Sequence, residues 1–142
     1  MSSRSTEVIS PEQNEPIDSY WTTARVRLRL QIKDFEIMTW SKQMRLLETR
    51  TKGGVSVFPA FQFVQRAGVW SVLIGLHEVL KPFKGVVGPD EGNSLASWLT
   101  TPEERLGGIS IIDHLKQDRD PKKAIALAQE TANRWQQPSN KI

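Results

Sequence analysis

Residues 25–32 can be interpreted as a strand or as a helix. Polar and apolar residues alternate there for eight positions, a period typical of a half-buried strand. The same residues fit a helix that begins at Thr22 or Thr23 and repeats its apolar side chains every four positions. The apolar spacing of residues 33–43 predicts a second short helix after a brief turn. Because two short helices joined in this way have helix-turn-helix proportions, the sequence favours the helix.

A β-hairpin is predicted after the second helix. Two β-prone runs, 47–51 and 55–58, flank a Lys-Gly-Gly tripeptide at 52–54, and glycine reaches positive φ at little cost. Pro59 ends the second run because proline cannot donate to a strand ladder. The order helix, turn, helix, hairpin is that of a winged helix-turn-helix. The aromatic-rich stretch 58–63 is expected to pack the hairpin onto the helices.

Helices are also expected in the second half of the chain. Apolar spacing predicts an amphipathic helix over 69–83, and the glycine-rich stretch 84–93 predicts a loop. Three further helices follow from the apolar positions and the capping residues: one over 95–99, one capped by Ser110, and one from Asp120-Pro121 to about Trp135.

The chain is therefore expected to be mainly α with a small β-hairpin. Residues 1–19 are expected to form a flexible arm, because they contain two prolines and few apolar side chains. Residues 20–66 are expected to form a winged helix-turn-helix-like DNA-binding module with a hairpin wing, and residues 67–142 a small helical bundle. A chain of 142 residues is long enough for one compact domain or two small, packed ones.

The positive charge of the chain is concentrated in the predicted module. The net charge is +3 overall, but residues 20–66 carry nine Lys and Arg side chains against three acidic ones, a net charge of +6. Residues 1–19 carry −3, and residues 67–142 are neutral. A concentrated basic surface attracts polyanions because phosphate contacts release condensed counterions. The alternative interpretation of the same charges is a solvated face with scattered basic side chains.

No catalytic or metal-binding pattern occurs in the sequence. The chain has no cysteine, which excludes disulfides, thiolate metal sites and cysteine nucleophiles. His77 and His114 are the only histidines, and neither has a partner at ligand spacing. We therefore expect no enzymatic activity, no cofactor and no metal. The sequence shows neither a run of roughly 20 apolar residues, as a membrane-spanning helix needs, nor a secretory signal, so a cytoplasmic protein is expected.

Three consecutive motifs mark the second half of the chain: Ala-Ser-Trp-Leu-Thr-Thr-Pro at 96–102, Arg-Leu-Gly-Gly at 105–108 and Ile-Ser-Ile-Ile-Asp-His-Leu at 109–115. In order and spacing they resemble the toxin-binding domain of the Xre/MbcA/ParS antitoxin family. The Phe-Pro-Ala-Phe-Gln-Phe stretch at 58–63 is similar to one that follows the helix-turn-helix of family members. One departure is Ser110-Ile111, where the family often has Thr-Pro.

This resemblance implies a type II antitoxin with two binding functions. The C-terminal helices would bind and neutralise a RES-type toxin, an NAD-consuming enzyme, while the helix-turn-helix would bind operator DNA and repress the operon. The resemblance places Leu106, Gly107 and Gly108 in the motif that supports the toxin-binding fold. It places Arg134 and Trp135 near the chain end that family members present to the toxin. The expected partners are a RES-type toxin and operator DNA, with no membrane partner.

Basic and hydroxyl side chains around the second predicted helix are the candidate DNA contacts. They are Lys33, Thr39, Ser41, Lys42 and Arg45 at the helix, and Arg50 and Lys52 beside the hairpin tip. Two features oppose this assignment. Asp34 and Glu36 at the start of the helix would repel phosphates, and Gln31 stands where the turn between such helices usually has glycine. A helix-turn-helix retained only for dimerisation is therefore an alternative.

Two other classes of function fit the same residues. One is a stand-alone DNA-binding transcriptional regulator of the excisionase or phage-repressor type, without a toxin partner. The other is an interaction adaptor whose basic half binds an acidic protein. A homodimer is expected for a DNA-binding protein of this type, because symmetric operators match two-fold symmetric proteins.

Overall fold

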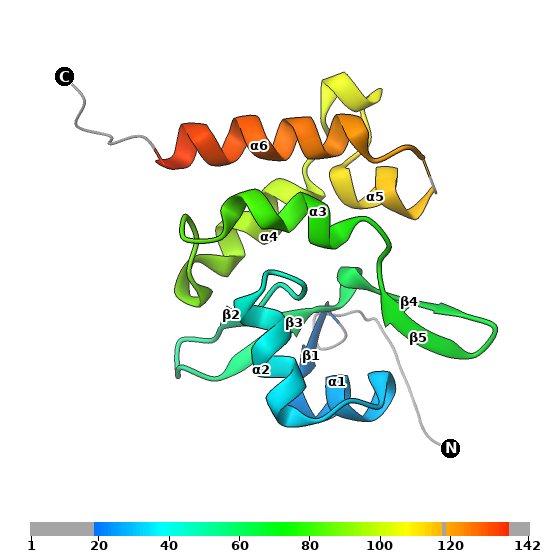
Figure 1. Ribbon diagram of the computed structural model, residues 1–142, viewed down its shortest axis with the longest axis vertical. Helices are drawn as coiled ribbons and strands as arrows, with labels where there is room; N and C mark the ends of the chain where they lie inside the picture. The colour runs from blue at the N-terminus through cyan, green and yellow to red at the C-terminus, as the bar shows by residue number, and fades with distance from the viewer. Residues whose placement is uncertain (1–18, 118, 137–142) are drawn as a thin grey trace, which may run out of the picture.

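The computed structural model describes residues 19–117 and 119–136, which form a mainly helical structure with small antiparallel sheets (Figure 1). This confirms the expected fold class. The flexible arm expected over residues 1–19 lies outside the described residues, apart from Ser19. The first elements in chain order are β1 (Tyr20–Thr22), α1 (Thr23–Leu30), α2 (Asp34–Lys42), β2 (Thr49–Arg50) and β3 (Ser56–Pro59). They are followed by β4 (Phe63–Arg66), β5 (Val69–Val72), α3 (Leu76–Leu80), α4 (Gly92–Thr100), α5 (Ile111–Lys116) and α6 (Lys122–Gln136).

Residues 23–30 form helix α1, so the helical interpretation of the alternating segment is confirmed. The Thr22 side chain caps the helix by accepting a hydrogen bond from the Arg25 backbone N–H at 3.1 Å. Gln31 ends the helix in the left-handed conformation, with φ 57° and ψ 47°. This is the conformation that glycine adopts most cheaply at helix ends. The turn to α2 therefore has the expected geometry, although a residue with a Cβ occupies it.

The predicted wing is present as the antiparallel pair β2 and β3, joined through an exposed turn at 51–55. The Gly54 backbone N–H donates to the Thr51 carbonyl at 2.9 Å, and Gly54 has φ 85°. Strand β1 pairs with the other edge of β3, which gives a three-stranded sheet in the order β1-β3-β2. This third strand was not predicted, because its three residues, although β-prone, form a run too short to indicate a strand by itself.

The helix predicted over 69–83 is wrong in its first part. Strand β5 occupies 69–72 and pairs with β4 across a two-residue turn at Ala67-Gly68. Both turn residues have positive φ, 52° and 80°, as a type I′ hairpin turn requires. Gly75, with φ 91°, then separates the strand from the short helix α3. The expected boundary between residues 66 and 67 falls at the turn of this hairpin.

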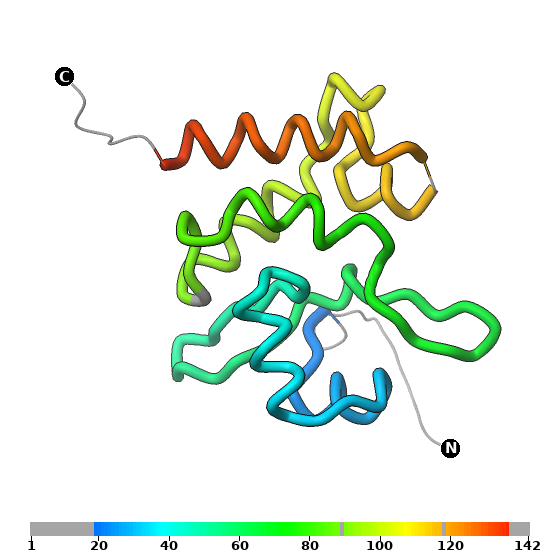
Figure 2. Tube along the Cα trace, viewed as in Figure 1, coloured from blue at the N-terminus to red at the C-terminus, as the bar shows by residue number. Residues whose placement is uncertain are grey.

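The capping residues of the last two helices act as predicted. The Ser110 hydroxyl accepts from the Asp113 backbone N–H at 3.0 Å at the start of α5. The Asp120 carboxylate accepts from the Lys122 backbone N–H at 3.0 Å at the start of α6. Helix α6 lies across α3 and α4 at one end of the molecule, far from α1 and α2 (Figure 2).

Two hydrophobic clusters make up the core. The smaller one packs α1 and α2 against the three-stranded sheet, and it is formed by Trp21, Val26, Ile37, Leu46, Phe58 and Phe63. The larger cluster is mainly aliphatic and lies among α3, α4, α5 and α6. The fully buried amide of Gln62 ties the aromatic stretch to Leu47, a member of the larger cluster, by bonding the Leu47 backbone N–H and carbonyl at 2.8 and 2.9 Å. The aromatic stretch 58–63 thus contributes to the core, as expected.

Candidate nucleic-acid interface

Helix α2 presents one continuous face to solvent. Phe35, Met38, Thr39 and Lys42 are all exposed, and their spacing places them on the same side of the helix. Ile37 on the opposite side is buried against the sheet. The exposed fractions of Phe35 and Met38 are 64% and 60%, so two large apolar side chains lie beside the hydroxyl of Thr39 and the ammonium of Lys42. Such a face offers apolar contacts, a hydrogen bond and a charge to a groove.

The acidic residues at the start of α2 are both engaged within the protein. The Glu36 carboxylate accepts from the Lys33 backbone N–H at 2.8 Å and so caps the helix. Asp34 forms an ion pair with Arg27 of α1 at 2.9 Å. Carboxylates in the first turn also complement the helix dipole. The expected repulsion of phosphates by these two residues is therefore reduced, and the ion pair holds the two helices of the helix-turn-helix together.

The other predicted contacts around α2 lie in different places. Lys33 and Lys42 are exposed at the two ends of the helix. The Arg45 guanidinium lies over the Trp40 ring at 4.5 Å from its centroid. The Ser41 hydroxyl oxygen is buried, without a hydrogen-bond partner among the described residues. Ser41 is thus the one predicted contact of this helix whose hydroxyl is not presented on the surface.

The wing carries two predicted backbone contacts. Lys52 is exposed in the turn of the β2–β3 hairpin and has no ion-pair partner among the described residues. Arg50 is shared between two acids, with its guanidinium 3.7 Å from Glu48 and 3.8 Å from Asp90. Lys52 is therefore the stronger candidate for a phosphate contact from the wing.

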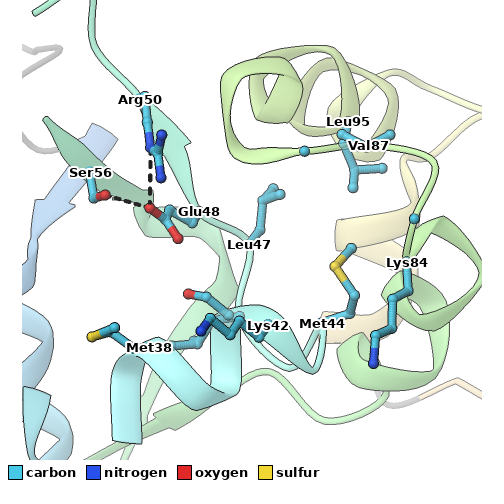
Figure 3. A pocket seen from close by; sticks show the side chains of 14 residues that line it. Met38, Lys42, Met44, Leu47, Glu48, Arg50, Ser56, Lys84, Val87 and Leu95 are labelled. Atoms are coloured by element: carbon cyan, nitrogen blue, oxygen red, sulfur yellow. Dashed lines mark hydrogen bonds and ion pairs between the residues drawn. The ribbon is translucent and has the colours of Figure 1, made fainter. Parts of the chain in front are cut away.

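An apolar groove of about 600 Å³ lies between α2 and the second half of the molecule (Figure 3). Its lining includes Met38 and Met44 on one side and Val87 and Leu95 on the other. Glu48 also lies in the groove, where its carboxylate accepts from the Ser56 hydroxyl. The groove thus combines apolar side chains with a carboxylate that is already bonded within the protein.

The structure also assembles a cluster that the sequence analysis missed. Arg25 and Arg29 of α1 meet Trp21 of β1 and Trp70 of β5 at one hollow. The spacing of the two arginines, four residues apart on a helix, was visible in the sequence. Their meeting with Trp70 depends on the β4–β5 hairpin, whose second strand was predicted as the start of a helix.

The residues that the resemblance assigned to toxin binding form parts of the helical half. Leu106 is buried in the larger core, and Gly107 and Gly108 adopt left-handed conformations with φ 82° and 90°. Arg134 is exposed on the last turn of α6, and the Trp135 ring packs 5.3 Å from the Phe83 ring while keeping 37% of its surface exposed. The turn and the end of α6 thus belong to one packed unit.

Arg105 fastens the turn at 104–106 to α6. Its guanidinium donates to the Glu130 carboxylate at 2.8 Å and lies 3.5 Å from Glu103. The hydrogen bond to Glu130 is the main reason that the pKa of Arg105 is raised above its ordinary value.

Among the described residues, no group of three or more histidine, aspartate or glutamate side chains is placed to hold a metal ion. No helix in the described ranges, 19–117 and 119–136, is long and apolar enough to cross a membrane.

Comparisons with known proteins bear on the fold. The chain matches no protein-family model and no curated protein. Among solved structures it is similar to the NMR structure of Rv2175c, with a TM-score of 0.53 and 20% sequence identity. The similarity covers 89% of this chain and 84% of that chain. It therefore extends over both the helix-turn-helix and the helical half, and it shows a shared fold.

Proposed function

We propose that the protein binds duplex DNA through a winged helix-turn-helix, with α2 in the major groove and the β2–β3 wing on the phosphate backbone. One observation carries the proposal: α2 presents an exposed face directly after a helix-turn-helix turn and directly before a two-stranded wing. This is the order in which such modules present a recognition helix. The net charge of +6 on residues 20–66 supplies the attraction to phosphate.

The chemistry of the α2 face fits a base-reading role. Lys42 can donate to guanine O6 or N7, and the Thr39 hydroxyl can bond a base edge. Phe35 and Met38 supply apolar contacts of the kind that recognise the thymine methyl group. A face with two large apolar side chains and one cation favours a site that contains thymine steps next to a guanine.

The salt dependence of binding tests the proposal. We expect the wild-type protein to bind DNA from upstream of its own gene with a steep salt slope, measured by fluorescence anisotropy. Lys52→Ala should lower that slope by about 0.9, as expected for the loss of one phosphate contact, whereas Lys42→Ala should relax the preference for the guanine that Lys42 contacts. Lys116→Ala is the matched control, since Lys116 is an exposed lysine on α5 in the helical half. A flat salt slope for the wild type would contradict DNA binding. It would support the alternative of an interaction adaptor whose basic half binds an acidic protein.

A second function, toxin neutralisation, is proposed for the helical half. It is supported by the packing of the Leu106-Gly107-Gly108 turn, which Arg105 ties to α6 through Glu130. The motif residues that resemble the antitoxin family thus support the helix that ends in Arg134 and the partly exposed Trp135. On this proposal the protein binds a RES-type toxin with the end of α6 and represses its own operon as a homodimer.

The end of α6 can be tested by changing two residues of its last turn, with the melting temperature measured to check that loss of the Trp135–Phe83 contact does not unfold the protein. Arg134→Glu combined with Trp135→Ala should abolish rescue of cells that express a RES-type toxin, while DNA affinity stays unchanged. Lys123→Ala, an exposed change at the other end of α6, is the control. If the wild-type protein neither rescues such cells nor binds the toxin, the stand-alone regulator is the better description.

A further inference from the structure

A hollow of about 420 Å³ opens beside α1, and residues of β1, β4, β5 and α1 line it. Its walls are Trp21 of β1, Phe63 of β4 and Trp70 of β5, with two arginines from α1 at its edge. The Trp21 and Phe63 rings stack with centroids 4.1 Å apart, and the Trp70 ring meets Trp21 edge-on at 4.9 Å. Two indoles at nearly a right angle, 79°, form a rigid aromatic corner.

The Arg29 guanidinium lies in that corner. Its central carbon is 4.8 Å from the Trp21 ring centroid and 4.9 Å from the Trp70 ring centroid. Both distances are within the range of cation–π attraction. Two such contacts hold the guanidinium between the two rings, and Arg29 is nevertheless exposed to solvent. The side chain is therefore held in place while its N–H donors remain accessible.

Arg25 lies one helical turn before Arg29 and lines the same hollow. Among the described residues, neither arginine has an ion-pair partner or a side-chain hydrogen bond. Arg27, on another side of the same helix, differs in this respect because Asp34 neutralises it at 2.9 Å. The helix thus pairs one of its three arginines and leaves two positive charges together at the hollow.

We infer that Arg25 and Arg29 form a binding site for a phosphate group. The planar guanidinium matches the oxygens of a phosphate in two parallel hydrogen bonds. Because the Arg29 guanidinium is already held in place by the two rings, less conformational entropy is lost when the ligand binds. The phosphate comes either from a nucleic-acid backbone or from a small phosphate compound, and the inference does not depend on base reading by α2.

The tryptophans of the hollow report on its occupancy. In an NMR titration of the full-length protein with inorganic phosphate at constant ionic strength, the indole N–H signals of Trp21 and Trp70 should shift. The signals of Trp98 and Trp135 in the helical half should stay in place and serve as internal controls. Absence of any shift at Trp21 and Trp70 with both phosphate and duplex DNA would overturn the site.

Neutralising the arginines shows whether they hold the ligand. Arg25→Gln should weaken phosphate binding about tenfold, the effect of losing one charge-assisted hydrogen bond. Of the two arginines it is Arg29 whose guanidinium lies over the tryptophan rings, so Arg25→Gln should keep the aromatic corner and the melting temperature. Arg27→Gln is the matched control on the same helix and should leave phosphate binding unchanged. If Arg25→Gln and Arg27→Gln weaken phosphate binding equally, the attraction comes from the overall positive charge of α1 and not from a site at the hollow, which would contradict the inference.

Duplex DNA distinguishes the two sources of the phosphate. If the ligand is a nucleic-acid backbone, Arg25→Gln should also weaken DNA binding and lower its salt slope by about 0.9. If the ligand is a small phosphate compound, Arg25→Gln should change DNA affinity no more than Arg27→Gln does. The same variant should still weaken the binding of inorganic phosphate. A shift with phosphate in a protein that binds no DNA would retain this site and contradict the proposed function.

Discussion

The helix-turn-helix region and the helical half differ in how their turns are made. Among the described residues, the three non-glycine residues with positive φ are Gln31, Met44 and Ala67, and all three precede α3. Beyond α3, the positive-φ positions at 85, 107 and 108 are all glycines. A left-handed conformation costs roughly 1–2 kcal/mol for a residue with a Cβ. The first region thus contains backbone strain that the second avoids.

The position of the strained residues gives this difference a functional meaning. Gln31 ends α1 shortly before α2 begins, and Met44 follows Gln43 at the end of α2, so left-handed residues flank the candidate recognition helix on both sides. Strain of this kind persists where the surrounding packing fixes it, and it is common at binding sites. The same region also carries the exposed apolar side chains of α2 and the arginines without acidic partners. The helical half has the better local geometry, and the first region has the features of a binding surface.

The largest effect on this comparison is expected from Gln62, which ties two segments of the first region together. Its amide makes three buried hydrogen bonds, two with the Leu47 backbone and one with the Pro59 carbonyl. Gln62→Leu leaves those backbone groups buried without partners, at about 1–3 kcal/mol each. We expect the free energy of unfolding in urea to fall by about 3 kcal/mol or more. Gln65→Leu, at an exposed position of β4, is the control. An equal loss of stability there would contradict the role of the buried Gln62 hydrogen bonds.

A smaller but clear loss is expected where the two halves touch at α4. A Cβ on Gly92 would lie 2.4 Å from the Glu48 carbonyl oxygen and 2.8 Å from a Thr49 methyl group. Gly92→Ala should therefore destabilise the protein by about 1–3 kcal/mol, as overpacking does, although alanine usually stabilises a helix relative to glycine. Gly53→Ala, whose nearest atom would be 3.8 Å away, should be nearly neutral. A stabilised Gly92→Ala variant would show that the halves do not pack closely there.

The features that the sequence predicted are those encoded over a few residues. Ser110 and Asp120 mark helix starts because each caps a backbone N–H within three residues. Strands β1 and β5 were missed although most of their residues are β-prone, because runs of three and four residues are short and β5 also fits the helical spacing predicted over 69–83. The helical spacing of 69–83 was real in its second part only, where α3 buries Leu76, Val79 and Leu80.

In the candidate site, too, features encoded over a few residues were predicted, and contacts between distant segments were not. The exposed face of α2 followed from the spacing of its residues, so Thr39 and Lys42 could be named from the sequence. The burial of the Ser41 hydroxyl depends on the groove formed with the second half of the molecule. The cluster of Arg29 with Trp70 depends on a hairpin whose first strand lies more than thirty residues downstream of α1. Contacts between distant segments are therefore what sequence patterns left out.

The smallest expected effect tests whether the strain around α2 serves binding. Gln31→Gly relieves a left-handed residue and should stabilise the protein by about 1 kcal/mol, seen as a rise in the melting temperature. Gly107→Ala, at φ 82° in the helical half, should lower the melting temperature by a similar amount. If the Gln31 side chain or its rigid turn positions α2, the more stable Gln31→Gly variant should bind DNA more weakly. Unchanged affinity in a stabilised variant would mean that the strain at this turn has no part in DNA recognition, and the contrast between the two regions would then be one of stability alone.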